Sequence, residues 1–236
     1  MGSLVNSKTR DVESVIEKLF STINQFASVE EATKALSKGM CQEFTTSGKS
    51  DLVLSRVFHS FDYQLLPDEI QKAGEKTLGS KPTDESKFLV LIGTYGDNPD
   101  WQDRRKSGGH KAIPLNRTTV KSIPMVARLF QQVGFDLGIV LGEKKEAINM
   151  GGVVGSYGVF HVPEALGSPF IPAQDFVKVN GVKSVLGTGV MLPEGDVGIY
   201  IGFCRVHITQ EMASQFASLM SLFWQKIYTL KERGMF

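Results

Sequence analysis

The apolar positions at the start of the chain recur at helical spacing. Between residues 11 and 27 they return every three or four positions, which predicts an amphipathic helix with Asp11 as its N-cap. Ser28 and Glu31 have the spacing of a capping box, so we expect a second helix over 29–38 that Gly39 ends. The apolar positions of the first helix are Val12, Val15, Ile16, Leu19, Phe20, Ile23 and Phe26.

The pattern then changes to short apolar segments. Residues 52–61 are rich in β-branched and aromatic side chains and predict a strand. Residues 88–95 form an apolar run short enough for a buried central strand. Between them we expect a short helix that starts at Pro67, where carboxylates follow in the first turn, and then a polar loop over 74–86.

Further elements follow in the middle of the chain. Residues 122–133 predict a helix, with Pro124 near its start and Gly134 just beyond its end, the expected order of these two residue types. The segments 135–141 and 157–162 predict strands. These elements are separated from the strand over 88–95 by a stretch with little periodicity, which we expect to be a loop.

The C-terminal third has the clearest pattern. Strands predicted over 184–192 and 197–206 flank a Pro/Gly turn at 193–196, which indicates an antiparallel hairpin. Thr209 is the expected N-cap of a long helix that ends near Glu232. Its apolar positions have nearly heptad spacing, so they pack either on the chain's own sheet or on a second chain. They are Met212, Phe216, Leu219, Phe223, Ile227 and Leu230.

Helices at both ends and strands between them predict an α+β fold with an antiparallel sheet. The 236 residues carry 26 Lys plus Arg and 25 Asp plus Glu, and this balance gives no basic field for a nucleic-acid partner. No apolar run is long enough for a membrane span. Residues 1–10 hold no apolar signal core, so we expect a cytoplasmic protein. Two cysteines cannot build a disulfide scaffold or a four-thiolate metal site.

Three stretches carry a family resemblance. Residues 181–203, followed by the long helix, resemble the final hairpin of GAF domains, which are relatives of PAS domains. Two more stretches resemble the GAF-like input module found ahead of bacterial histidine kinases and cyclases. Their matching residues are Trp101, Arg104, Arg105, Ser107, Gly109, His110 and 112–115 in the first, and 160–165, 167–174, Phe176, Val177 and 184–187 in the second.

The resemblance implies a GAF-like antiparallel sheet flanked by helices, with a ligand cavity above the sheet. It also implies a homodimer formed through the long terminal helices. On this basis we expect an N-terminal helical arm over 1–45, a sensor core over 46–208 and a C-terminal signalling and dimerisation helix over 209–236.

The loop over 96–111 is the first candidate for chemistry, because loops often carry function. Five potentially cationic side chains fall within eight residues, and guanidinium groups suit carboxylate and phosphate ligands. The alternative is a solvated loop whose arginines pair with nearby acids such as Asp100 and Asp103. The cationic residues are Arg104, Arg105, Lys106, His110 and Lys111.

His161 and Glu164 have a spacing that can serve a metal on a helix. Pro163 intervenes and the run looks extended, so the two side chains point to opposite faces and we predict no shared metal site. His161 is then a hydrogen-bonded histidine or a cavity-lining group, and His110 or His161 is a metal ligand only if haem is bound. The candidate ligand-binding residues are Trp101, Arg104, Arg105, His110, Phe160, His161 and Glu164.

No catalytic constellation is visible in the sequence. Some GAF proteins are methionine sulfoxide reductases that use closely coupled cysteines, whereas Cys41 and Cys204 lie far apart along this chain. The glycines at 151–155 lack the Lys-Ser/Thr ending of a phosphate loop, and we expect a mobile surface loop there. We therefore predict a non-catalytic sensory module of bacterial signal transduction. It would bind an unknown small molecule, require no cofactor, and relay the signal through its terminal helices to a partner protein. The alternative is a haem-binding protein or small redox enzyme on the same fold.

Overall fold

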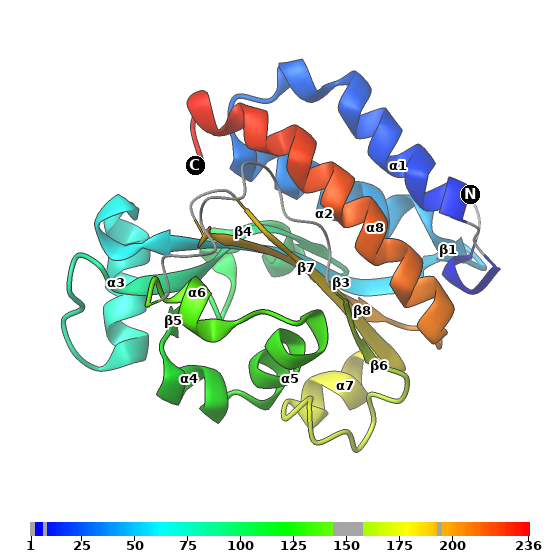
Figure 1. Ribbon diagram of the computed structural model, residues 1–236. Helices are drawn as coiled ribbons and strands as arrows, with labels where there is room; N and C mark the ends of the chain where they lie inside the picture. Colours follow the sequence, from blue (N-terminus) through cyan, green and yellow to red (C-terminus); the bar gives the residue numbers. More distant parts are fainter. Residues whose placement is uncertain (1–2, 7–8, 144–157, 193–194) are drawn as a thin grey trace.

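A six-stranded antiparallel sheet forms the centre of the molecule in the computed structural model, which describes residues 3–6, 9–143, 158–192 and 195–236 (Figure 1). The strands lie in the order β5-β4-β3-β8-β7-β6. The first and the last strand of this sheet in sequence, β3 and β8, therefore pair at its centre. The strands are β3 (Leu52–Asp62), β4 (Lys87–Gly96), β5 (Ala112–Leu115), β6 (Val159–Val162), β7 (Ser184–Met191) and β8 (Val197–Cys204). The short strands β1 (Thr45–Thr46) and β2 (Lys49–Ser50) pair with each other.

Helices cover both faces of this sheet (Figure 1). One face carries α1 (Thr9–Ser21), α2 (Val29–Glu43) and α8 (Gln210–Ile227), so segments from both ends of the chain lie side by side. The opposite face carries α4 (Arg117–Ser122), α5 (Pro124–Val133), α6 (Leu137–Val140) and α7 (Gln174–Asn180), while α3 (Asp68–Leu78) packs beside the β5 edge. The α+β fold class predicted from the sequence is confirmed.

The apolar core is divided by the sheet into two layers, one beneath each set of helices. The layer under α8 is packed closely enough to require glycine in the strands. A Cβ atom on Gly198 of β8 would lie 2.3 Å from Cε2 of Trp224, and one on Gly93 of β4 would lie 2.6 Å from the backbone carbon of Thr33. Real Cβ atoms do not approach other atoms so closely, so these glycines allow α8 and α2 to rest directly on the sheet.

Several local predictions are confirmed. The side chain of Ser28 accepts a hydrogen bond from the backbone N–H of Glu31 at the start of α2, and Thr209 caps α8 by accepting from Met212 N–H. The strands over 52–61, 88–95 and 157–162 and the final hairpin are present, although Tyr157 and the turn residues 193–194 lie outside the described residues, as does the glycine segment 151–155. The apolar residues of α8 face the chain's own sheet: Met212, Phe216, Phe223, Ile227 and, in the following 3-10 helix, Leu230 are buried.

Three predicted boundaries at the helical ends are wrong. The first helix ends at Ser21 and is followed by a separate 3-10 turn, η2 (Ile23–Gln25). Gly39 does not end α2, which continues to Glu43 because the residues beyond the glycine, Met40 and Cys41, are buried against the sheet. The helix that follows Pro67 extends through the expected loop to Leu78, where Gly79 ends it in the left-handed conformation.

The middle of the chain departs further from the pattern. The helix expected over 122–133 is present as α5, which begins at Pro124 and is ended by Gly134 in the left-handed conformation. Ile123 separates it from α4, which was not predicted, because the residue before a proline is disfavoured in helical conformation. The strand expected over 135–141 is wrong: Asp136 accepts a hydrogen bond from Gly138 N–H and begins the short helix α6. The helix α7 was not predicted. No helix among the described residues is long and apolar enough to cross a membrane.

Candidate ligand-binding site

A cavity of about 310 Å³ lies between the sheet and the helices of its second face. Its floor comes from the central strands β3, β4 and β8, and its walls come from α5, from the start of α7 and from the loop after β4. Among the described residues that line it, all but Arg56 and His110 are apolar. The apolar residues are Leu54, Phe58, Leu89, Trp101, Ile113, Ile123, Met125, Val126, Leu129, Ile171, Pro172, Ala173, Phe176, Ile199, Ile201 and Phe203.

Arg56 stands in the middle of the cavity floor. It lies on β3 opposite Thr94 of β4 and Ile201 of β8, so both neighbouring strands flank it. Its Nη2 donates a hydrogen bond to Ser107 Oγ at 3.0 Å, while its Nε is fully buried and has no hydrogen-bond partner among the described residues. Burial lowers the pKa of Arg56 to about 10, because removal of water disfavours the charged form.

His110, in the loop after β4, is solvent-exposed and is the second polar residue that lines the cavity. Its backbone has a φ of 59°, a left-handed conformation that residues other than glycine adopt infrequently. Histidine is one of the residue types in which this conformation is more common. Desolvation, and then the positive charge of Arg56, lower its pKa. The imidazole is therefore biased toward its neutral form, in which it can donate or accept a hydrogen bond.

Aromatic rings form one wall of the cavity. The ring of Trp101 meets that of Phe176 edge to face at 5.6 Å, and Phe176 meets Phe203 in the same manner at 5.2 Å. The carbonyl of Trp101 accepts a hydrogen bond from Thr94 Oγ1 at 2.9 Å, which ties the loop to β4. These contacts join the loop, α7 and the sheet at the rim of the cavity.

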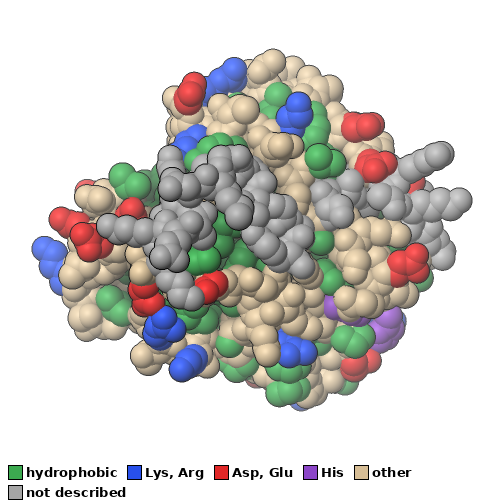
Figure 2. All heavy atoms as spheres, viewed as in Figure 1, with side chains coloured by type: hydrophobic (Ala, Val, Ile, Leu, Met, Phe, Trp, Pro, Cys, Tyr) green, Lys and Arg blue, Asp and Glu red, His purple; other side chains and the backbone are tan. Residues whose placement is uncertain are grey.

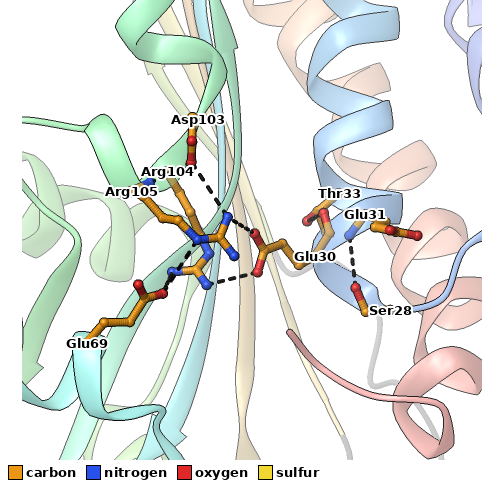
Figure 3. Close-up of polar contacts among 8 residues, drawn as sticks. All are labelled: Ser28, Glu30, Glu31, Thr33, Glu69, Asp103, Arg104 and Arg105. Carbon is orange, nitrogen blue, oxygen red and sulfur yellow. Dashed lines mark hydrogen bonds and ion pairs between the residues drawn. The ribbon is translucent and has the colours of Figure 1, made fainter.

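The two arginines of the loop after β4 do not line the cavity. They lie in η5 (Arg104–Lys106), and their guanidinium groups point toward α2 and α3 (Figure 3). Arg104 pairs with Glu30 at 2.9 Å and with Glu69 at 3.0 Å, and Arg105 pairs with Glu30 at 3.2 Å. Both side chains thus pair with carboxylates of the chain itself: Glu30 and Glu69 come from the distant helices α2 and α3, and Asp103 is adjacent in sequence.

The other candidate residues lie at the β6 end of the sheet. Phe160 is fully buried in the core beneath α5. The two ring nitrogens of His161 lie 2.9 Å from Gln210 Oε1 and 2.7 Å from the carbonyl oxygen of Ile208, so the ring is held at the start of α8. Glu164 is exposed, and one of its oxygens accepts a hydrogen bond from Leu166 N–H. Of the predicted set, the structure brings Trp101 and His110 together at the cavity and leaves these three outside it.

The two thiols lie in the same layer of the core despite their separation in sequence. Cys41 of α2 and Cys204 of β8 are buried on the same side of the sheet, and a negative charge on Cys41 would raise the pKa of Cys204. Burial raises the pKa of Cys41 to about 12 and that of Cys204 further, so both sulfurs are held as neutral thiols. Within the described residues, no group of three metal-binding side chains is present.

Charged side chains are scattered over the face shown in Figure 2, with both signs interspersed among apolar and neutral groups. This distribution agrees with the near-zero net charge of the sequence. The described side chains on this face do not gather into a large surface of one sign, so the electrostatic features of interest are the local ones at Arg56 and at the Arg104 cluster.

The chain is similar to several solved structures. A free methionine-R-sulfoxide reductase from Neisseria meningitidis, solved in complex with its substrate, has a TM-score of 0.53 at 9% identity, over 97% of this chain and 94% of that chain. The GAF domain of a phosphoenolpyruvate-protein phosphotransferase from Coxiella burnetii has a TM-score of 0.46 at 13% identity, over 96% and 98%. The phycoerythrobilin-bound GAF domain of a cyanobacterial phytochrome has a TM-score of 0.46 at 11% identity, over 94% and 97%. No protein-family model and no curated protein matches the sequence.

The architecture that the sequence resemblance implied is present: an antiparallel sheet with helices on both faces and a cavity above one of them. The reductase, at a TM-score of 0.53, shares this fold. Sequence reasoning missed Arg56, the charged residue at the centre of the cavity. The signal for it was present, because a single arginine interrupts the otherwise apolar and small-residue stretch 52–58.

Proposed function

We propose that this protein is a non-catalytic sensory domain that binds a small molecule in the cavity floored by β3, β4 and β8. The observation that carries the proposal is the cavity itself: about 310 Å³ enclosed by apolar side chains, with two polar side chains reaching it from different elements. Small-molecule sites in proteins combine this kind of apolar lining with a few placed polar groups. The volume is near the lower end of the range for such sites, which favours a small ligand.

Filling the cavity tests this function. Ala173 lines the cavity at the start of α7, and a tryptophan there would occupy ligand space without cutting into the sheet. Val179, on the exposed side of the same helix, provides a matched control because its side chain is 84% exposed. A library of small molecules is screened by thermal shift against wild type, Ala173→Trp and Val179→Trp. We expect compounds that stabilise wild type and Val179→Trp but not Ala173→Trp. Compounds that stabilise all three proteins equally, or none at all, would contradict the proposal.

The loop between β4 and β5 offers a route from this cavity to the C-terminal segment. Trp101 lines the cavity, and three residues later Arg104 lies over the ring of Phe236 at 5.3 Å. The same C-terminal segment accepts hydrogen bonds from the first turn of α2: Val29 N–H donates to Gly234 O and Glu30 N–H donates to Met235 O. A ligand that moves the loop would shift Arg104 and so loosen or tighten the contacts of the C-terminal segment. The ligand changes the equilibrium between the loosened and the tightened arrangement only if it binds one of them more tightly than the other.

Hydrogen exchange tests the relay. The backbone amides of Val29 and Glu30 report directly on the contact with the C-terminal segment, because their partners are its carbonyl groups. We expect a cavity ligand to change the exchange rates of these two amides. Unchanged rates at saturating ligand would leave binding intact and exclude this route of signalling.

We further propose a homodimer and a cytoplasmic signalling role of the kind the sequence resemblance implies, with input modules of bacterial histidine kinases and cyclases as the model. The apolar residues of α8 are buried on the chain's own sheet, so a dimer would use the outer surfaces of the terminal helices. Leu19, Phe20 and Ile23 are only partly buried there. Light scattering over a wide concentration range tests the dimer, and a monomer throughout would contradict it.

A further inference from the structure

The guanidinium of Arg56, a partly buried residue, differs in its charge partners from that of the buried Arg104. Arg104 is enclosed by two carboxylates, those of Glu30 and Glu69. Within the described residues, Arg56 has no ion pair, and its one hydrogen bond goes to the neutral hydroxyl of Ser107. A cation that is partly removed from water and has no counter-charge is unfavourable. The sheet therefore holds a positive charge at the cavity floor that nothing in the described part of the chain neutralises.

The free hydrogen-bonding groups of Arg56 are suited to a planar anion. Arginine has five N–H donors in a fixed fork, and its Nε is buried and unpartnered while Nη2 is anchored by Ser107. Ser107 is itself fixed, because its hydroxyl donates to Gly109 O at 3.0 Å. Nε and an N–H of a terminal nitrogen form an edge that pairs with both oxygens of one carboxylate. The guanidinium is thus held in place before any ligand arrives.

The rest of the lining limits the ligand to one charge. No other Lys or Arg among the described residues lines the cavity, and no carboxylate does. His110 is biased toward its neutral form and adds a hydrogen bond rather than a second charge. A phosphate dianion would leave one negative charge unbalanced in an apolar cavity, which is costly. The aromatic and branched side chains that make up the remaining surface would contact an apolar body.

We infer that the cavity binds a small apolar monocarboxylate, an aryl or branched-alkyl acid, whose carboxylate pairs with the guanidinium of Arg56. This inference rests on the small-molecule binding proposed above and adds the chemical class of the ligand. Arg56 is the residue that selects acids over neutral compounds of the same shape. The apolar lining selects the body of the ligand.

Matched probes test the inference. Two series are titrated into the protein by calorimetry: hydrocinnamate, hydrocinnamide and hydrocinnamyl alcohol, and isovalerate, isovaleramide and isoamyl alcohol. A hydrogen-bonded charge pair predicts that an acid binds at least ~10-fold more tightly than its amide or alcohol. In Arg56→Met, the acid should lose this advantage while the alcohols keep their affinity. Lys106→Met removes an exposed cation from the neighbouring loop and should change neither preference.

The outcomes separate the two proposals. Neutral probes that bind wild type as tightly as the acids, or an acid preference that survives in Arg56→Met, would overturn the inference and leave small-molecule binding in place. If no probe of either series binds wild type more tightly than Ala173→Trp, the inference fails. Compounds of other chemistry that the thermal-shift screen identifies as cavity ligands would then show that the proposed binding function still holds. Folding of Arg56→Met is checked by thermal unfolding. Should it not fold, Arg56→Lys keeps the charge without the planar fork, and we expect it to weaken acid binding while neutral probes are unaffected.

Discussion

Nη2 of Arg104 lies 2.9 Å from Oε2 of Glu30, and the two side chains are only 7% and 13% exposed. The pair joins the loop after β4 to the first turn of α2. The carboxylate of Glu30 faces the guanidinium groups of both Arg104 and Arg105 (Figure 3). Because both partners are largely removed from water, their interaction is screened less than that of a surface ion pair. The loop therefore depends on this contact for its position.

Substitution of Glu30 by Gln should destabilise the protein. The change removes the better-buried carboxylate and leaves Arg104 with only the half-exposed Glu69, so we expect a loss of about 1–3 kcal/mol in the free energy of unfolding. Chemical denaturation measures it. Glu43→Gln is the matched control, because Glu43 pairs with the largely exposed Lys18 and a surface pair contributes at most ~1 kcal/mol. Equal effects of the two substitutions would show that the Arg104 pair has no special role.

Substitution of Gly198 by Ala should disturb the packing of α8 on the sheet. The new Cβ would overlap the indole ring of Trp224, which is itself buried and has no space to move away. Overpacking of this kind costs about 1–3 kcal/mol or more. Thermal unfolding measures the loss, and Gly108→Ala is the control because nothing lies within 4 Å of its Cβ position. If Gly198→Ala unfolds at the wild-type temperature, then α8 does not rest on β8 as described.

The buried His59 should make stability depend on pH in the mildly acidic range. It lies on β3 between the rings of Phe61 and Trp224, at 4.5 and 5.8 Å, and burial lowers its pKa to about 4. The unfolded chain binds the proton near pH 6.5 and the folded chain only near pH 4, so stability is full above pH 6.5 and falls as the pH drops between these values. The contribution is up to about 3 kcal/mol.

His59→Phe should flatten this part of the pH profile, since phenylalanine packs between the same rings and carries no proton. Denaturation across pH 4 to 7, a range taken from the folded and unfolded pKa of His59, gives the comparison. The exposed His207 serves as control, and His207→Asn should retain the wild-type slope. A slope that survives in His59→Phe would assign the pH dependence to other groups.

The two cysteines should be unreactive in the native protein. Both are buried, and their pKa values are raised by desolvation, so the thiolate that reacts with alkylating agents is scarcely populated near neutral pH. Iodoacetamide followed by mass spectrometry should label neither Cys41 nor Cys204 until denaturant is added. Rapid labelling of one thiol under native conditions would revive the thiol-based redox enzyme as the alternative function.

An absorption spectrum of the purified protein bears on the haem alternative. A Soret band would favour it, and separate replacement of His110 and His161 would then locate the ligand. We expect no such band, because both ring nitrogens of His161 are already held by Gln210 and Ile208. If a band appears, His110 is the first residue to replace, because it is the one histidine of the described residues that lines the cavity.

The sequence determined the elements that depend on local physics. The capping residues Ser28 and Thr209 begin helices where their spacing predicts, because a side-chain oxygen satisfies free backbone N–H groups a few residues away. The strands β3, β4, β7 and β8 follow from runs of β-branched and apolar residues. The family resemblance then implied how these strands and helices are arranged.

The tertiary structure decided everything that depends on residues distant in sequence. It turned the apolar side of α8 onto the chain's own sheet, placed Arg104 and Arg105 against carboxylates of α2 and α3, and buried Cys41 and Cys204 in the same layer of the core. It also left Arg56 without a counter-charge at the cavity floor. Charge partners and burial depend on which strands and helices pack together, and the spacing of residues along the sequence does not show which elements are neighbours in space. The sequence therefore left open whether the arginines of the basic loop bind an anion or pair with acids of the chain, and it did not show that Arg56 of the central strand lies at the cavity floor.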